Sequence, residues 1–318
     1  MKKLITLLTL LIVLHKPSGA VNIVPDSVVA LYQKLNNAEQ RLIDFKDSDK
    51  DLKLKLEQLQ IINESRVKHQ SGEVKLDILA SRMANKMCKE AALNNYTGHW
   101  NMAGEKPYQR YAFAGGLDHV SENASGKSTN GEFAQNDNTV LSSMKELHHL
   151  FMSESAPNDG HKINCTDKRH NYVGIGFYLT AQQFRYYEEF IDRYYSFADV
   201  PVKVKVNQEF SLKLKTEAGW YLCYLVAYKD KAPKKIKAAK ISLKHSYKDY
   251  TKKTALVVKP WSFVNYKFEG VYKIPLKFEK AGLYYIQIYQ DQKEYRTPKN
   301  FNTEGKIQAS GVVITVEE

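Results

Sequence analysis

The second part of the chain, from residue 201 onward, alternates hydrophobic and polar residues in short segments separated by polar turns. Side chains two positions apart on a strand point to the same face, so this period of two predicts strands with one buried face. The alternating positions are Val202, Val204 and Val206, Phe210, Leu212 and Leu214, Ala255 and Val257, Ile274, Leu276 and Phe278, Tyr284, Ile286 and Ile288, and Val312, Ile314 and Val316. Repeated strands of this kind predict an all-β, immunoglobulin-like sandwich over residues 200–318.

The first part of the chain has a different pattern, in which hydrophobic residues recur every three or four positions. This helical period predicts one or two amphipathic helices over residues 21–58 and another helix over residues 140–152. A short apolar run at residues 172–179 predicts a strand, whereas residues 181–195 fit either a strand followed by a linker or a short helix. Mixed helices and strands over residues 59–195, followed by the β-sandwich, indicate an α+β protein.

The length of 318 residues is sufficient for two domains, and the first residues have the pattern of a secretory signal. Lys2 and Lys3 precede an apolar run over residues 4–14, and small residues occupy positions 18–20. A membrane span needs about 20 apolar residues, so this run is too short to be an anchor. We predict a signal peptide over residues 1–20, no transmembrane anchor, and a secreted, extracellular protein.

The net charge of +12 is confined to the C-terminal part. Residues 201–318 contain 23 Lys and Arg against 11 Asp and Glu, and the remainder has equal numbers of the two charges. In a secreted protein, a basic surface favours anionic polysaccharides or lipid headgroups over nucleic acid. The densest cluster either binds such an anionic surface or forms a solvated loop; its lysines are Lys231, Lys234, Lys235, Lys237 and Lys240.

Three cysteines, Cys88, Cys165 and Cys223, permit one internal disulfide in an oxidising compartment, with one thiol left over. Cys88 and Cys165 lie in one predicted domain, and we predict that these two residues are bridged. The alternative is three separate buried thiols that pack as small hydrophobic side chains.

Five short motifs follow one another in the first part of the chain. They are Asn63-Glu-Ser-Arg66, His99 followed by Gly104, Pro107 and Arg110, Ser121-Glu-Asn123, Gly160-His161, and Val173-Gly-Ile-Gly176. In this order they resemble the CAP superfamily of SCP-domain proteins, which includes cysteine-rich secretory proteins, antigen 5 and plant pathogenesis-related proteins. The resemblance covers about residues 59–180. After Gly160-His161 the family often has Thr and then Trp, whereas this chain reads Lys-Ile-Asn-Cys, so it resembles a divergent branch.

The resemblance implies an α-β-α sandwich with a central cleft that displays two histidines and two glutamates. His99 and His161 match the histidines, and Glu122 matches the glutamate of the family's Glu-Asn motif. For the second glutamate, Glu146 on the predicted helix is the first choice. Glu154, which is nearer to His161 in the sequence, is the second choice.

Two imidazoles and two carboxylates in one cleft could hold zinc or another divalent cation, with His99 and His161 as ligands. They could equally form a metal-free network in which each histidine donates to a carboxylate. The residues are too far apart in the sequence to form a local metal motif, so both arrangements remain open at this point.

The sequence contains neither a Gly-x-Ser-x-Gly elbow nor a Gly-rich phosphate loop. Members of the family that it resembles are reported to bind sterols, fatty acids or other proteins. We therefore favour a non-enzymatic secreted protein that binds a lipid or an extracellular partner through the cleft. The alternative is a metal-dependent secreted hydrolase, a protease in which Glu122 or Glu146 activates a zinc-bound water. A purely structural role is the third hypothesis.

Overall fold

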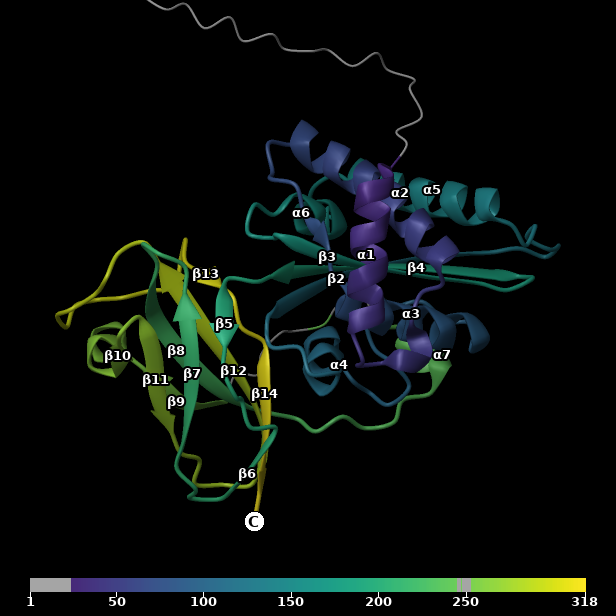
Figure 1. Ribbon diagram of the computed structural model, residues 1–318. Helices are drawn as coiled ribbons and strands as arrows, with labels where there is room; N and C mark the ends of the chain where they lie inside the picture. Colours follow the sequence, from purple (N-terminus) through teal and green to yellow (C-terminus); the bar gives the residue numbers. More distant parts are fainter. Residues whose placement is uncertain (1–23, 245–246, 248–252) are drawn as a thin grey trace, which may run out of the picture.

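Figure 1 shows a computed structural model of the protein, which describes residues 24–244, 247 and 253–318. Helices and strands are mixed in the first part and strands dominate the second, so the predicted α+β class is confirmed. The signal peptide predicted for residues 1–20 lies outside the described residues. Within the part of the chain that the structure describes, every helix is too short or too polar to span a bilayer.

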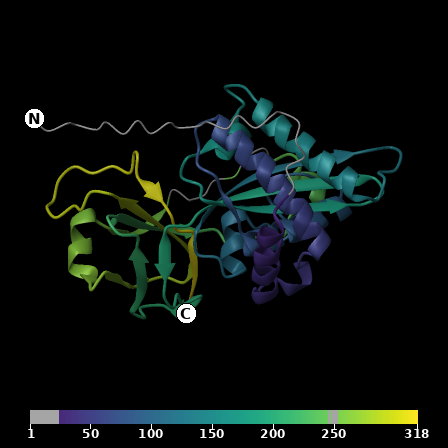
Figure 2. The ribbon, with the colours of Figure 1, turned by 45° about the horizontal axis from the view of Figure 1, so that its top comes forward.

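The first part of the chain folds into three layers, with a four-stranded sheet between two layers of helices (Figures 1 and 2). Its elements are α1 (Asp26–Ala38), η1 (Ile43–Phe45), α2 (Asp49–Lys68), β1 (Lys75–Leu76), α3 (Ile78–Leu93), α4 (Pro107–Phe113), β2 (His119–Ser128), α5 (Asp137–Ser153), α6 (Gly160–Thr166), β3 (Tyr172–Leu179) and β4 (Gln183–Asp192). The strand order is β1-β3-β4-β2, with β1 parallel to β3 and the other neighbours antiparallel. Helices α3 and α4 cover one face of the sheet, and α2, α5 and α6 cover the other.

Helix α2 connects the N-terminal segment to these layers. It begins after Ser48, whose hydroxyl accepts the backbone N–H of Asp51 at 3.1 Å. Its buried Leu52 and Ile62 belong to the core that α5 and the sheet also form. Because α2 packs in this core, the N-terminal helices share one core with the three layers.

Helix α3 packs very closely on β3, the strand predicted at residues 172–179. Gly174 and Gly176 both face this helix. A Cβ atom on Gly174 would lie 2.4 Å from the Cβ of Ala80, and one on Gly176 would lie 2.4 Å from the carbonyl carbon of Ala84. A side chain at either position would therefore push the helix and the strand apart.

The second part of the chain forms two packed sheets. Their elements are β5 (Tyr195–Phe197), β6 (Lys203–Lys205), β7 (Phe210–Thr216), β8 (Tyr221–Asp230), α7 (Ala238–Ile241), β9 (Thr254–Val258), η2 (Pro260–Tyr266), β10 (Lys267–Phe268), β11 (Val271–Leu276), β12 (Gly282–Asp291), β13 (Ile307–Gln308) and β14 (Val312–Glu317). One sheet has the order β10-β11-β7-β5, and the other has the order β6-β14-β12-β8-β9 with β13 beside β12. Alternate residues of both sheets, among them Leu212, Ile274 and Ile286, form one core, as the period of two predicts.

The two parts meet at helix α4 and strand β12. The ring of Tyr108 on α4 stacks on that of Tyr285 on β12, with 4.2 Å between the centroids. The Tyr108 hydroxyl donates to the buried Asp230 at the end of β8, and Gln109 donates to the same carboxylate at 2.8 Å. This contact attaches α4 to the β-sandwich through both packing and hydrogen bonds.

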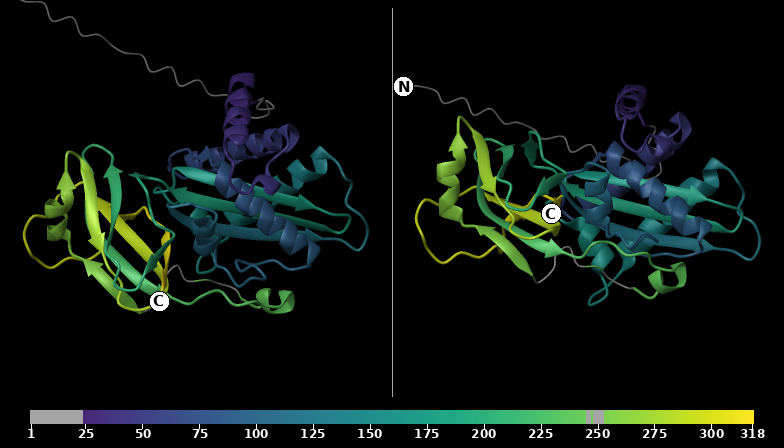
Figure 3. Two further views of the ribbon diagram at one scale, coloured as in Figure 1. Left: turned by 60° about the horizontal axis from the view of Figure 1, so that its bottom comes forward. Right: turned by 90° about the horizontal axis from the view of Figure 1, so that it is seen from below.

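The segment of residues 231–244, here called the strap, also links the two parts. It leaves the end of β8 and runs along the helical part to α7 (Figure 3). The N–H of Ile236 donates to the carbonyl of Met102 at 2.9 Å. The fully buried Ile241 packs with Met87 and Tyr187 in the core on the α3 side of the sheet. The strap is therefore anchored to the helical part at two points.

The three cysteines are buried free thiols, so the predicted bridge between Cys88 and Cys165 is wrong. Cys88 lies on α3 and packs with Tyr187 on one face of the sheet. Cys165 lies on α6 in the core of the opposite face. The sheet itself separates the two sulfur atoms, which the positions in the sequence could not reveal.

Replacing Gly176 by alanine should destabilise the protein. The added Cβ would lie 2.4 Å from the backbone of Ala84, so we expect the free energy of unfolding to fall by about 1–3 kcal/mol. Urea denaturation measures the change. Gly72→Ala is the control, since nothing lies within 4 Å of a Cβ added there; a loss of equal size in both variants would show that the close packing is not responsible.

Candidate functional site

The predicted cleft residues lie around β2, the strand at one edge of the first sheet. Glu122 is on β2, His99 lies between α3 and α4, and Glu154 and His161 lie at the two ends of the α5–α6 connection. His99 Nδ1 is 2.8 Å from Glu122 Oε1, and His161 Nδ1 is 2.5 Å from Glu154 Oε1. The centroids of the two imidazole rings are 6.3 Å apart. The structure therefore brings two histidine–glutamate pairs together.

Glu154 follows α5 directly and also fixes the start of α6. Its Oε2 atom accepts the backbone N–H of His161 at 2.9 Å and that of Lys162 at 3.4 Å. N–H groups in the first turn of a helix have no partner within the helix, so a side-chain acceptor stabilises the helix start. The same carboxylate thus sets the position of α6 and the orientation of the His161 ring.

Glu146, the first choice for the second glutamate, does not belong to this group. It lies on the solvent side of α5, where its side chain is 54% exposed and pairs with Lys127 at 2.6 Å. The apolar residues Met144, Leu147 and Phe151 turn the opposite side of α5 toward the core. Glu154, the second choice, occupies the position beside His161 instead.

Arg110 on α4 is the cation that compensates the buried carboxylates beneath His99. It pairs with Glu122 Oε2 and lies 3.7 Å from Glu189 Oε1. Glu122 and Glu189 are directly opposite each other on β2 and β4, and both side chains are fully buried. Arg110 also donates to the carbonyl of His99 at 2.7 Å. One guanidinium therefore holds the His99 loop against the strand that carries Glu122.

Burial shifts the pKa values of this cluster. Burial, followed by the positive charge of Arg110, lowers the pKa of His99 to about 4, so its imidazole is neutral at pH 7. Burial, followed by the charge of Glu122, raises the pKa of Glu189 well above its ordinary value, so this carboxyl remains protonated. A neutral imidazole retains one nitrogen lone pair, which can bind a cation or accept a hydrogen bond.

Aromatic rings flank both histidines. The ring of Tyr247, from the connection between β8 and β9, lies 4.9 Å from the His99 ring. Its hydroxyl accepts the backbone N–H of Glu122 at 3.0 Å. The ring of Phe151 lies 4.7 Å from that of His161. The site therefore combines two polar pairs with apolar walls, and one wall comes from the second part of the chain.

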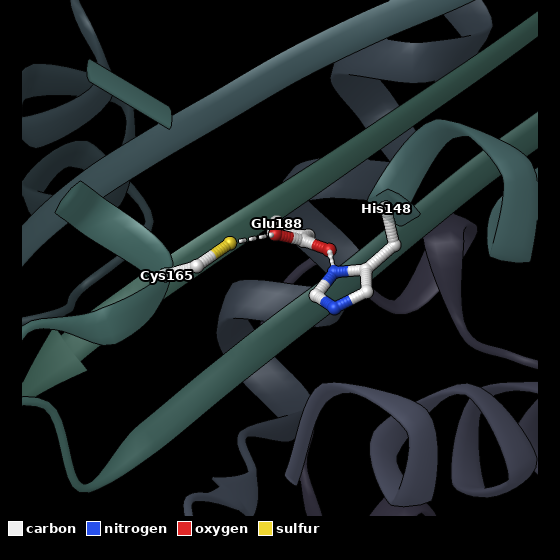
Figure 4. A group of neighbouring side chains, drawn as sticks. All are labelled: His148, Cys165 and Glu188. Atoms are coloured by element: carbon white, nitrogen blue, oxygen red, sulfur yellow. Dashed lines mark hydrogen bonds and ion pairs between the residues drawn. The ribbon is translucent and has the colours of Figure 1, made fainter. Parts of the chain in front are cut away.

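A second group of titratable side chains lies on the other face of the sheet (Figure 4). His148 of α5, Cys165 of α6 and Glu188 of β4 are fully buried, and each offers a ligand atom within 4.8 Å of the others. Such a group could hold a metal ion, whereas the sequence assigned the metal ligands to His99 and His161.

Hydrogen bonds keep Glu188 ionised within this group. Burial alone would raise the pKa of Glu188, but the charge of His148 and the hydrogen bonds from His148, Tyr186 and Cys165 outweigh burial and lower it. The closest of these bonds, from His148 Nδ1 and the Tyr186 hydroxyl, are both 2.7 Å long. The pKa values of the two neighbouring glutamates of β4 are therefore shifted in opposite directions.

Sequence reasoning missed Glu188, Glu189 and Tyr247. The two glutamates lie between aromatic residues, after Tyr186 and Tyr187 and before Phe190, a position where charged residues are rarely buried without partners. That anomaly was the available signal. Tyr247 is 125 positions from Glu122, and nothing in the local sequence indicates that the two residues meet.

Comparisons with known proteins give no family assignment. No protein-family model matches the chain, and no curated protein does. Among solved structures, an extracellular protein containing an SCP domain from Bacillus anthracis is 20% identical over 42% of this chain and 39% of its own, with a TM-score of 0.31. An outer surface protein from Borrelia burgdorferi is 14% identical over 44% of this chain and 92% of its own, with a TM-score of 0.35. The chain spans about two fifths of the first of these proteins, and TM-scores this low do not establish a shared fold.

The neighbouring glutamates of β4 should respond differently to the loss of a charge. Glu188→Gln should lower the free energy of unfolding at pH 7 by about 3 kcal/mol, because it removes the charge that compensates buried donors. Glu189→Gln should leave stability unchanged or raise it, because glutamine resembles the protonated carboxyl. Urea denaturation of both variants at pH 7 tests this expectation.

The pH dependence provides an independent check on the same variants. The contribution of Glu189 is complete below its ordinary pKa of 4.5 and is lost as the pH rises, because its folded-state pKa is raised. The stability of Glu189→Gln relative to the wild type should therefore increase with pH above 4.5. The lowered pKa of Glu188 predicts the reverse, with its contribution lost as the pH falls. Equal losses in the two variants at pH 7 would contradict these protonation states.

Proposed function

We propose that the chain is a secreted, CAP-type binding protein whose His/Glu cleft takes a lipid or an extracellular partner. In this proposal a signal peptide occupies residues 1–20, a helical segment residues 21–58, the CAP domain residues 59–195, and an immunoglobulin-like domain residues 200–318. The observation that carries it is the meeting of His99, Glu122, Glu154 and His161 at one site, since these residues are scattered in the sequence. The resemblance identified three of these residues before the geometry was known.

The contacts of the cleft favour an amphipathic ligand. Each histidine directs Nδ1 to a glutamate, and within the described residues neither Nε2 atom has a hydrogen bond. On His99, which is neutral at pH 7, Nε2 can accept a hydrogen bond from a hydroxyl group. Tyr247 and Phe151 provide apolar surface beside the imidazoles. These features suit a lipid with a donor headgroup, as in a sterol.

A binding role is favoured over catalysis because the carboxylates already have partners. Glu122 is held by Arg110 and by His99, and Glu154 accepts bonds from the ring and the backbone of His161. A general base needs a carboxylate that is free to take a proton from a bound water. Neither glutamate is free in this arrangement.

The alternative function is a metal-dependent secreted protease, with a divalent cation such as zinc on His99 and His161. One observation favours it: histidines that ligate metals commonly direct their other ring nitrogen to a carboxylate, as both do here. In such a site the cation would polarise a bound water or a substrate carbonyl. The same geometry therefore supports a second, less favoured function.

The strap carries the basic cluster, and we propose that it contacts an anionic surface. All five lysines of the cluster are exposed, although the segment is anchored to the helical part by Ile236 and Ile241. Anchoring keeps these positive charges on one part of the surface, which increases the local potential toward a polyanion.

A fluorescent sterol titration tests the cleft. We expect the wild type to bind the sterol and the His99→Gln, His161→Gln double variant to bind roughly fivefold more weakly or worse, since losing one hydrogen bond costs about 1 kcal/mol. Glu146→Gln is the control, because Glu146 lies outside the cleft.

Two outcomes would count against this proposal. Equal sterol affinity of the wild type, the double variant and Glu146→Gln would show that the cleft is not the binding site. Failure to detect any bound lipid or partner by native mass spectrometry and affinity capture would contradict a binding role. Peptide cleavage that a chelator abolishes, and that His99→Ala and His161→Ala both lack, would favour the protease.

Replacing the five lysines of the cluster by glutamine should weaken retention on heparin, so that the protein elutes at lower salt. The matched control removes five exposed lysines from the helical part and changes the net charge equally. An identical shift in elution for both variants would mean that total charge, rather than the strap, determines retention. The control lysines are Lys34, Lys53, Lys68, Lys89 and Lys145.

A further inference from the structure

The group of His148, Cys165 and Glu188 lies apart from the His/Glu pairs of the cleft. It is enclosed by α2, α5, α6 and the sheet, within a core of apolar residues. All three side chains are fully buried. Burying a thiol, an imidazole and a carboxylate in an apolar core costs free energy, which their mutual hydrogen bonds offset. The function proposed for the His/Glu pairs does not use these three residues.

We propose that these three residues form a closed zinc site, in which His148 Nδ1, the Cys165 thiolate and both oxygens of Glu188 supply four ligand atoms. Nitrogen, sulfur and carboxylate oxygen are the donors that zinc accepts, whereas calcium and magnesium prefer oxygen alone. The site is structural, because four protein donors leave no position for a substrate or a water.

The geometry of Glu188 fits this arrangement. Its Oε1 atom is 2.7 Å from His148 Nδ1, and its Oε2 atom is 3.3 Å from Cys165 Sγ (Figure 4). Each carboxylate oxygen thus faces one of the other two ligands, and the three residues each offer a ligand atom within 4.8 Å of the others. The three residues come from α5, α6 and β4, so that one ion would hold three elements together.

The charges balance when zinc binds. The thiolate of Cys165 and the carboxylate of Glu188 each contribute one negative charge, and His148 coordinates as a neutral imidazole. Together they neutralise Zn²⁺, so that no net charge is buried. His148 loses the proton on Nδ1 and keeps the one on Nε2, and Cys165 loses the proton of its thiol, both to solvent. Binding to the charged form of His148 therefore releases two protons for each ion.

Each ligand also has a partner that would orient it. His148 Nε2 is 2.9 Å from the hydroxyl oxygen of Ser65, which can accept a hydrogen bond from the Nε2–H group. The Tyr186 hydroxyl donates to Glu188 Oε1 at 2.7 Å. The Asn123 amide donates to Cys165 Sγ at 3.1 Å. Residues that hydrogen-bond to metal ligands orient these ligands and increase the affinity of the site for the metal.

Metal binding to the refolded full-length mature chain tests the proposal. We expect the chain refolded with Zn²⁺ to retain one equivalent after desalting, and refolding with Co²⁺ to produce an absorption band from thiolate-to-cobalt charge transfer. Cys165→Ser should lose this band and the retained metal. Cys88→Ser is the matched control, because Cys88 is another buried thiol on the opposite face of the sheet; it should keep both.

The cleft requires a separate control, since His99 and His161 could bind a cation too. The His99→Gln, His161→Gln double variant should retain the cobalt–thiolate band, which needs sulfur. Absence of the band and of retained zinc in the wild type would overturn the proposal, as would a band that survives in Cys165→Ser. If Cys165→Ser does not fold, X-ray absorption of the wild-type zinc protein decides: a sulfur ligand supports the site, and its absence overturns it.

Discussion

Two adjacent glutamates, Glu188 and Glu189, are buried on opposite faces of one strand, and the surrounding polar residues are arranged to compensate them. An isolated buried carboxylate costs far more free energy than the net stability of a typical domain. His148 and Tyr186 satisfy Glu188 on one face, while Glu189 stays protonated beside Glu122 on the other. Since side chains alternate along a strand, a register shift of one residue would exchange the two faces and leave both carboxylates without their partners.

The compensation on the α4 side links Glu122 and His99 to the second part of the chain. Arg110 and Tyr108 lie on the same short helix, but Arg110 holds Glu122 and the His99 loop while Tyr108 stacks on Tyr285 of β12. A displacement of the β-sandwich would therefore move the helix that positions the guanidinium. The ring of Tyr247, which also comes from the second part of the chain, lies against His99. The surroundings of His99 and Glu122 thus depend on the second part of the chain at two points.

Much of the fold, and part of the site, could be predicted from local patterns. The period of two predicted β6, β7, β9, β11, β12 and β14 but not the ten-residue strand β8, and the apolar run at residues 172–179 matches β3. Glu146 was misplaced because it was chosen from the resemblance alone, whereas the buried Met144 and Leu147 leave it on the solvent side of α5. The predicted disulfide between Cys88 and Cys165 was wrong because the sheet lies between the two residues, and local sequence patterns do not show which side of a sheet a residue occupies. The buried group of His148, Cys165 and Glu188 could not be predicted from local patterns for the same reason, because its members come from three different elements.

Helix α6 connects the buried group around Glu188 to the two histidine–glutamate pairs. It carries His161 near its start and Cys165 one turn later, so the two side chains lie on the same side of this short helix. Asn123 joins them from β2, because its amide donates both to the carbonyl of His161 and to the sulfur of Cys165, each at 3.1 Å. In the neighbouring position Glu122 points to the opposite face and meets His99. The consecutive Glu122 and Asn123 thus serve two faces of one strand, and an ion bound at Cys165 would restrain the helix that presents His161.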